Sequence, residues 1–484
     1  MEANILTKDN IQELTLLIQQ LYLEDEIPWV VGYSGGKDST AALQLVWNAI
    51  AHLPAERKKH KVVHVISTDT LVESPVVVAW VNLSMEKMRH AAQEQSLPVI
   101  THRLKPTIQN TYWVNLIGKG YPAPRSNFRW CTSRLKIEPS NRFIREVITN
   151  HGEVILVLGT RKAESSSRAR VMKRYENKRV RDYLSPNASL FNSLIFSPIE
   201  NWSNDDVWLY LMQVKNPWSH SNKDLLSMYR GASVDGECPL VVDTSTPSCG
   251  SSRFGCWVCT LVEEDKSMAA MILNDDEKSW MTPLLEFRNE IGDMSKDRER
   301  RDFRRMDGRL LLHNDRLVHG PYIKQWREYL LRSLLEIQKN INTSGPQEFC
   351  NLELITLEEL QEIRRIWLVD KHEFDDSLPK IYEEVIGKEF PQAESLHSSS
   401  IFGEEEWHLL KEICDNDEML FELQTSLLDI EQRSHMLTLR KGVIEELEEQ
   451  IRRCYFKNEE DAEAFARKKS IQLQIDTLKV GDSN

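Results

Sequence analysis

Apolar and polar positions in the first third of the chain alternate between short apolar runs and longer segments with helical spacing. The short runs are rich in Val and Ile and predict buried strands at residues 27–34, 61–68, 97–104 and 153–160. Apolar residues recur with helical spacing over residues 6–22, 39–53 and 76–95. Because strands separated by helix-length segments form βαβ units, the pattern predicts an α/β fold with a doubly wound parallel sheet.

The pattern changes after the fourth of these strands. Residues 161–182 are rich in Ser and Arg, lack a clear apolar period and predict a mobile loop. A helix capped by Ser203 or Asn204 is expected further on. From residue 321 onward the spacing of apolar residues predicts a mostly helical C-terminal part.

Composition excludes several classes of protein. The chain has 484 residues, of which 41% are hydrophobic and 28% charged, as in ordinary globular proteins and unlike disordered or collagen-like chains. The first residues lack the basic and apolar regions of a signal peptide. The most apolar short stretch, Pro75 to Val81, is far below the roughly 18 residues of a membrane helix. We therefore expect a cytoplasmic protein without a membrane segment.

Charge is distributed unevenly along the chain. The formal net charge is −13, from 61 basic and 74 acidic side chains. Residues 351–484 hold 16 basic and 32 acidic side chains, a net of −16, so residues 1–350 carry a net of +3. The N-terminal part can therefore meet a polyanion, whereas the C-terminal part would repel one.

The segment between the first predicted strand and the helix after it is suited to binding phosphate. It reads Ser34-Gly35-Gly36-Lys37-Asp38-Ser39. The glycines allow close backbone approach, the helix N-terminus presents N–H groups, and Lys37 adds a positive charge. A Walker A loop is excluded, because Val31 stands where that motif needs Gly and Asp38 follows the lysine.

This segment, following an apolar strand, resembles the PP-loop of the N-type ATP pyrophosphatases and the PAPS reductase group, which share the adenine nucleotide alpha hydrolase-like fold. The resemblance implies that residues 34–39 bind the pyrophosphate of ATP with the help of Mg²⁺, with Lys37 and Asp38 as catalytic residues. Residues 159–165 are similar to the Gly-x-Arg-x-x-Glu-Ser segment of that group, which implies that Arg161 contacts a phosphate.

Two further side chains are candidates for the same site. Asp69 ends a predicted strand, where α/β sheets bind ligands, and either meets a ribose or metal or caps the turn. Cys131 resembles the cysteine that precedes a basic pair in the PAPS reductase group and is a candidate sulfur carrier. Nearby Arg134 and Lys136 would favour its thiolate, whereas Trp130 favours a buried core cysteine instead.

Four of the eight cysteines crowd into one segment rich in Gly, Ser and Pro. They are Cys238, Cys249, Cys256 and Cys259, with the spacing C-x10-C-x6-C-x2-C. Four thiolates hold either structural Zn²⁺ or a 4Fe-4S cluster. Zinc sites more often use two close pairs, and only one pair is close here, so the spacing favours the cluster, with Zn²⁺ as the alternative.

The phosphate loop and the late cysteine block together resemble the DndC-type sulfurtransferases of bacterial DNA phosphorothioation, with the SspD type as a close counterpart. The resemblance covers about residues 25–340. It implies that ATP activates a non-bridging phosphate oxygen of DNA, which sulfur from a cysteine desulfurase then replaces. It also implies DndD- and DndE-like partner subunits. The alternatives are a tRNA thiolase, an adenylyl-sulfate (PAPS) reductase-like enzyme, or a non-catalytic ATP-binding scaffold of a DNA-modification complex.

These patterns predict three parts and two candidate DNA contacts. The parts are a PP-loop nucleotide-binding α/β domain (1–230), a cysteine-rich and basic region (231–340), and an acidic helical region (341–484). Residues 161–182 and 298–309 are rich in arginine, and we expect DNA to contact one of these stretches unless both are simply solvated.

Overall fold

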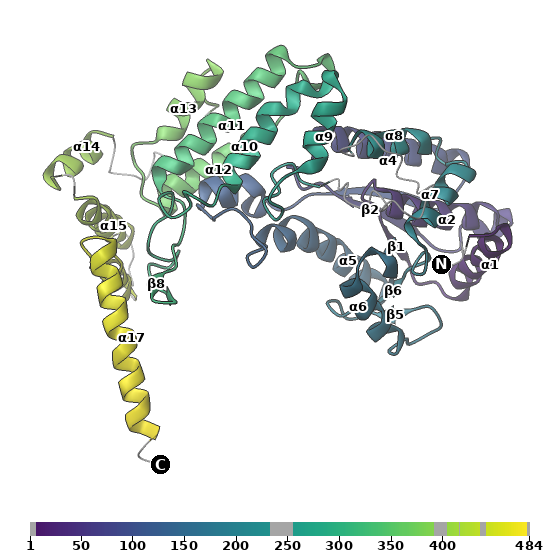
Figure 1. Ribbon diagram of the computed structural model, residues 1–484, viewed down its shortest axis with the longest axis horizontal. Helices are drawn as coiled ribbons and strands as arrows, with labels where there is room; N and C mark the ends of the chain where they lie inside the picture. The colour runs from purple at the N-terminus through teal and green to yellow at the C-terminus, as the bar shows by residue number, and fades with distance from the viewer. Residues whose placement is uncertain (1–5, 233–254, 392–403, 416, 436–441, 482–484) are drawn as a thin grey trace. The chain divides into compact units, whose positions relative to one another are not determined.

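The computed structural model describes residues 6–232, 255–391, 404–415, 417–435 and 442–481 (Figure 1). The chain divides into two compact units. One contains residues 1–107 and 124–288, and the other contains residues 108–123 and 289–484. The three-part division at residues 230 and 340 stays a prediction.

A six-stranded sheet forms the centre of the first unit. Its strand order is β3-β2-β1-β4-β6-β5, and every pair is parallel except the edge pair of β5 and β6. The strands are β1 (Trp29–Gly32), β2 (Val63–Thr68), β3 (Val99–Leu104), β4 (Val154–Val157), β5 (Ser185–Pro186) and β6 (Ser193–Phe196). The predicted α/β fold with a parallel sheet is confirmed. The sequence pattern missed β5, which has only two residues, and β6.

Both faces of this sheet are covered, which makes it doubly wound. Val31, Val65 and Val157 face a core that includes buried residues of α1 (Lys8–Glu24), α2 (Lys37–Ala51), α4 (Pro75–Glu94), α7 (Asn204–Gln213) and α8 (Asn222–Gly231). Their neighbours Val30, Ile66 and Leu156 face the other way, toward Ile144 and Val147 of α5 (Glu138–His151). Alternate residues of a strand point to opposite faces, so near-continuous apolar strands are what a sheet buried on both sides requires.

The second unit is mostly helical, as predicted. Its long helix α11 (Lys324–Ser344) lies beside α13 (Ser377–Ile386) (Figure 1). Its other helices are α12 (Leu357–Arg365), α14 (Glu404–Ile413), α15 (Glu418–His435), α16 (Val443–Arg453) and α17 (Glu459–Gly481), with a small hairpin of β7 (Leu312–His313) and β8 (Arg316–Leu317). The segment 108–123 joins this unit because Trp113 Nε1 donates to the Leu354 carbonyl at 2.7 Å.

The remaining helices are short. They are α3 (Ala55–Lys58), α6 (Ser166–Glu176), α9 (Lys266–Asn274) and α10 (Thr282–Gly292). None of the helices in the described ranges combines the length and the apolar character that a membrane crossing needs.

Helix α6 corrects the prediction of a mobile loop over residues 161–182. Ser165 caps the helix by accepting a hydrogen bond from the Arg168 N–H. The helix contains no buried residue, so its sequence needs no apolar stripe. Arg, Ala, Met, Lys and Glu are good helix formers, and a capped run of them forms a helix without an apolar period.

Candidate functional site

The phosphate loop joins the carboxyl end of β1 to the first turn of α2. Gly35 has φ of +77°, and a Cβ built there would lie 2.5 Å from Val81 Cγ2, so only glycine fits. The Ser39 hydroxyl donates to the Gly36 carbonyl at 3.0 Å and lies 3.1 Å from the Ser34 hydroxyl. The loop is therefore fixed by its own side chains, with the N-terminus of α2, a 15-residue helix, at its end. This is the arrangement that binds phosphate through backbone N–H groups.

Three charged residues meet at this loop. Lys37 Nζ lies 3.0 Å from Asp38 Oδ2, and Arg161 Nε donates to Asp38 Oδ1 at 2.7 Å. Arg161 is 3% exposed and also donates to the Trp202 carbonyl at 3.3 Å. The structure thus brings together Lys37, Asp38 and Arg161, although Arg161 lies 123 residues beyond Asp38 in the chain.

Two aromatic residues that no sequence motif indicated also hold this loop. Trp80 Nε1 on α4 donates to the Gly35 carbonyl at 3.1 Å. The Lys37 N–H, in the first turn of α2, donates to the Tyr229 hydroxyl of α8 at 3.3 Å. Burial raises the pKa of Tyr229, so its hydroxyl stays protonated. Both residues reach the loop from elements distant in the sequence, which is why no local pattern marks either of them.

The loop after β2 carries Asp69 and Glu73. Asp69 Oδ1 accepts the Leu71 N–H at 3.0 Å, and Leu71 has a left-handed φ of 63°, so Asp69 caps this turn. The other oxygen, Asp69 Oδ2, lies 3.6 Å from Arg103 Nη2, as does Glu73 Oε2. One carboxylate oxygen of Asp69 therefore caps the turn, which was one of the two roles considered for this residue. The ligand-binding role predicted for this residue stays a prediction.

The close cysteine pair is built onto this same loop. The Trp257 N–H donates to the Val72 carbonyl at 2.9 Å, and the Ser74 N–H donates to the Gly255 carbonyl at 3.4 Å. Cys256 forms an antiparallel bridge with Glu73, and its sulfur lies 3.3 Å from the Thr70 hydroxyl. The connection between β2 and α4 thus holds the pair by backbone hydrogen bonds.

The other two predicted ligands, Cys238 and Cys249, lie outside the described residues. Within the described ranges, no group of three His, Cys, Asp or Glu side chains is arranged to hold a metal ion. The four-cysteine metal site therefore stays a prediction.

Cys131 and Lys136 lie in the electrostatic surroundings of the cysteine pair. Cys256, Glu73, Cys259 and Cys131 all raise the pKa of Lys136, Cys256 most strongly. Burial raises the pKa of Cys131, and it raises the pKa of Cys256 to about 11. Of the two interpretations of Cys131, burial acts in the direction of the core cysteine, and its role as a sulfur carrier stays a prediction. Lys136 is thus a cation whose pKa all three thiols affect.

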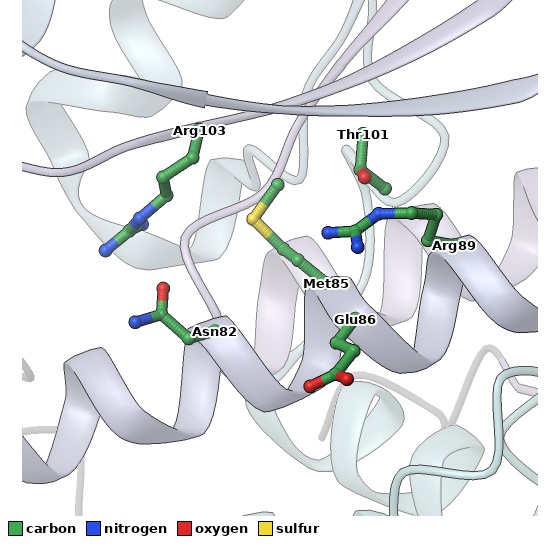
Figure 2. Close-up of a pocket in the computed structure, with 6 residues that line it drawn as sticks. All are labelled: Asn82, Met85, Glu86, Arg89, Thr101 and Arg103. Carbon is green, nitrogen blue, oxygen red and sulfur yellow. The ribbon is translucent and has the colours of Figure 1, made fainter.

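A hollow of about 320 Å³ adjoins this region on α4 and β3. Figure 2 shows the guanidinium groups of Arg89 and Arg103 on either side of Met85, with the amide of Asn82 facing Arg103. The full lining is Asn82, Met85, Glu86, Arg89, Thr101 and Arg103. Arg103 also donates to the Ser67 hydroxyl at 2.8 Å, so it joins the hollow to the end of β2. Two guanidinium groups and an amide are donors suited to an oxyanion.

The two arginine-rich stretches differ in the structure. Within residues 298–309, Arg301 pairs with Asp297 at 2.9 Å, and the Arg300 guanidinium lies 3.9 Å from the centre of the Trp326 ring. Arg304 pairs with Asp302 and Glu422, both at 2.7 Å. These arginines hold the second unit together, and their contacts do not favour DNA binding there. The cations of α6, by contrast, are exposed.

Comparison with a protein-family model agrees with the fold of the first unit. Residues 28–261 match the family model of the phosphoadenosine phosphosulfate reductase domain. An uncharacterized protein of Methanocaldococcus jannaschii is 27% identical over 202 residues, 42% of this chain and 35% of that protein. The matched region thus spans about a third of that relative's length. The U34-tRNA thiolase NcsA from Methanococcus maripaludis, solved with its 4Fe-4S cluster, is 15% identical with a TM-score of 0.27, over 45% of this chain and 72% of that one.

The matched family region contains most of the residues described above. It includes the phosphate loop, Arg161, Cys131 and the pair Cys256 and Cys259. This chain therefore carries a PAPS reductase-like domain over residues 28–261.

Proposed function

We propose that this protein is an ATP-dependent sulfurtransferase of DNA phosphorothioate modification. One observation carries the proposal: the phosphate loop and the cysteine pair are held by the same segment of chain. The connection between β2 and α4 bonds to the backbone of residues 255 and 257, and α4 bonds to Gly35 through Trp80. A nucleotide at the loop and sulfur at the cysteines would then act on one substrate within one unit.

The loop residues supply the binding of pyrophosphate. The N–H groups of α2, the Lys37 ammonium and the Arg161 guanidinium would hold the leaving pyrophosphate, while Asp38 orients both cations. Asp38 and Asp69 offer the carboxylate oxygens that Mg²⁺ prefers, and the ion would neutralise phosphate charge. A phosphodiester oxygen attacks the α-phosphorus of ATP, pyrophosphate leaves, and the DNA phosphate becomes an adenylate with AMP as its leaving group.

The thiols supply the second half of the reaction. The terminal sulfur of a persulfide, provided by a cysteine desulfurase, attacks the activated phosphorus, and AMP leaves with the former DNA oxygen. A second thiol then takes the carrier sulfur as a disulfide and leaves one sulfur atom on the DNA. Cys131 is the proposed carrier, and Cys259, whose charge acts on Cys131, would be the second thiol.

The predicted cluster fits the donors present. Cys256 and Cys259, with Cys238 and Cys249 of the same segment, would hold a 4Fe-4S cluster, or Zn²⁺ in the alternative. A cluster supplies a site that binds or relays sulfur. Two cysteines separated by two residues are a ligand pair for either metal centre.

The test is mass spectrometry of nuclease-digested DNA from cells that carry the native neighbouring genes. Phosphorothioate dinucleotides are expected with the wild-type protein and with Lys59→Ala, an exposed lysine away from the loop, and are expected to disappear with Lys37→Ala. Lys37→Ala lacks the positive charge that would hold the leaving pyrophosphate. Wild-type DNA without phosphorothioate would exclude DNA as the target and make tRNA thiolation the next test. Equal amounts of phosphorothioate with the wild-type protein and with Lys37→Ala would favour the alternative that the protein is a non-catalytic ATP-binding scaffold.

A further inference from the structure

The surface around α6 combines cations with exposed apolar side chains. Phe191 is 91% exposed, the highest value among the large apolar side chains that the structure describes. Val180 is 66% exposed and Tyr183 is 45% exposed. Exposed apolar side chains together with cations suit a partner that offers both negative charge and an apolar face.

The cations of α6 are available for such a partner. Its basic residues are Arg168, Arg170, Lys173 and Arg174, all exposed. Arg168 pairs with Glu164 at 3.2 Å, on the surface, where an ion pair contributes little. Within the described part of the chain, neither Lys173 nor Arg174 takes part in an ion pair. In residues 298–309, by contrast, Arg301 and Arg304 have side chains that are almost buried and paired with carboxylates.

The turn that carries Phe191 is held in place. The Asn187 N–H donates to the Ser193 carbonyl at 2.9 Å, and the Asn187 side chain accepts the Ser189 N–H at 2.9 Å. The exposed ring therefore stands on an ordered turn between β5 and β6.

The turn and the helix belong to one surface. The Ser185 hydroxyl donates to the Tyr175 carbonyl, in the last turn of α6, at 3.4 Å, and the Arg179 guanidinium lies 5.7 Å from the centre of the Tyr183 ring. Arg161 follows the carboxyl end of β4, just before α6. Phe191 precedes β6, which runs parallel to β4, so it lies at the opposite end of the sheet. Glu176, the last residue of α6, pairs with Lys162, and Lys162 directly follows Arg161, so α6 lies at the phosphate-loop end of the sheet.

We propose that this surface binds single-stranded DNA, with the α6 cations on the backbone and Phe191 stacked on an unpaired base. The inference rests on the proposed function for its choice of DNA. Cations track the backbone of single strands and duplexes alike, but a base offers its face to an aromatic ring only when it is unpaired. A strand along α6 would have one end at the phosphate loop, where its phosphodiester would be activated.

The experiment is fluorescence anisotropy of the full chain without ATP, with a labelled single-stranded DNA and the duplex of the same sequence. Phe191→Ala is expected to weaken single-strand binding about tenfold and to leave duplex binding unchanged, because the stacking of one base is removed. Phe191→Trp is expected to bind as the wild type does. Leu16→Ala, which removes another exposed apolar side chain (57%) of the same unit, is the matched control.

A double variant tests the binding of the DNA backbone. Lys173→Ala with Arg174→Ala is expected to weaken both DNAs and to lower the salt slope on the single strand by about 0.7 for each phosphate that the protein no longer neutralises. Wild-type single-strand affinity in folded Phe191→Ala would overturn the inference, and so would equal losses of affinity for single strand and duplex. Tighter binding of RNA of the same sequence would overturn the choice of DNA.

The two proposals fail separately. If single-strand binding depends on Phe191 but the DNA of cells that make the protein contains no phosphorothioate, the DNA-binding surface is supported and the proposed sulfur transfer is rejected. Phosphorothioate that depends on Lys37, with no effect of Phe191 on binding, would do the reverse.

Discussion

Release of pyrophosphate from ATP is expected to fall about 100-fold when Gly159 is replaced by Ala. A Cβ at Gly159 would lie 2.5 Å from the Asp38 carbonyl oxygen and 2.8 Å from the Ser39 nitrogen. Both atoms belong to the backbone of the phosphate loop, so the loop itself must move to make room. Displacing a reacting group by about 1 Å costs a rate factor of that order. The measurement is the rate of pyrophosphate release at saturating ATP.

Gly231→Ala is the matched control for that variant. A Cβ there meets nothing within 4 Å, and the residue lies at the end of α8, so unchanged release is expected. Thermal unfolding of both variants separates a displaced loop from an unfolded protein. A folded Gly159→Ala protein that releases pyrophosphate at the wild-type rate would show that the loop is not the site of ATP cleavage.

Replacing Cys256 or Cys259 by Ala is expected to remove most of the iron that the protein takes up on anaerobic reconstitution. Cys256 is held by the β2–α4 connection on both sides, so the backbone fixes the position of its thiol. Without one thiolate, a metal centre with four cysteine ligands loses one of its four bonds to the protein. The measurements are iron, zinc and sulfide per chain, together with phosphorothioate in cells.

Two other cysteines make this test specific. Cys350→Ala removes an exposed thiol beyond the matched family region and is expected to keep both iron and phosphorothioate. Cys131→Ala is expected to keep iron and lose phosphorothioate, since Cys131 is the proposed carrier and not a ligand. If the wild-type protein contains zinc and no iron, the four cysteines bind structural Zn²⁺ and not a 4Fe-4S cluster. Loss of iron from Cys131→Ala would make this residue a ligand.

Much of the fold was predictable because it is encoded locally. Four apolar runs correspond to the strands β1 to β4, helical spacing of apolar residues corresponds to α1, α2 and α4, and the cap at Ser203 corresponds to α7. The parallel order follows, since each strand is separated from the next by a crossover. The segment 108–123 was not assignable in this way, because its place depends on a hydrogen bond of Trp113 with a residue 241 positions away.

The candidate site was predictable only in part. The phosphate loop lies within six consecutive residues, so its composition alone indicated phosphate. Tyr229 and Trp80 were missed because a single aromatic residue in an amphipathic helix looks like core. For Cys131 the sequence left two interpretations open, because the charges beside it are visible in the sequence whereas its burial is not.

By itself, the sequence determined the strand pattern, the phosphate loop and the close pair of cysteines, since each is a short-range pattern of residue types. Only the tertiary structure decided that Arg161 bonds to Asp38, that Cys256 pairs with the loop after β2, and that the cations of α6 face solvent whereas Arg301 and Arg304 are buried in ion pairs. The physical reason is that strand order and burial bring distant segments together. A side chain's charge state and partners depend on those neighbours and not on the residues beside it in the chain.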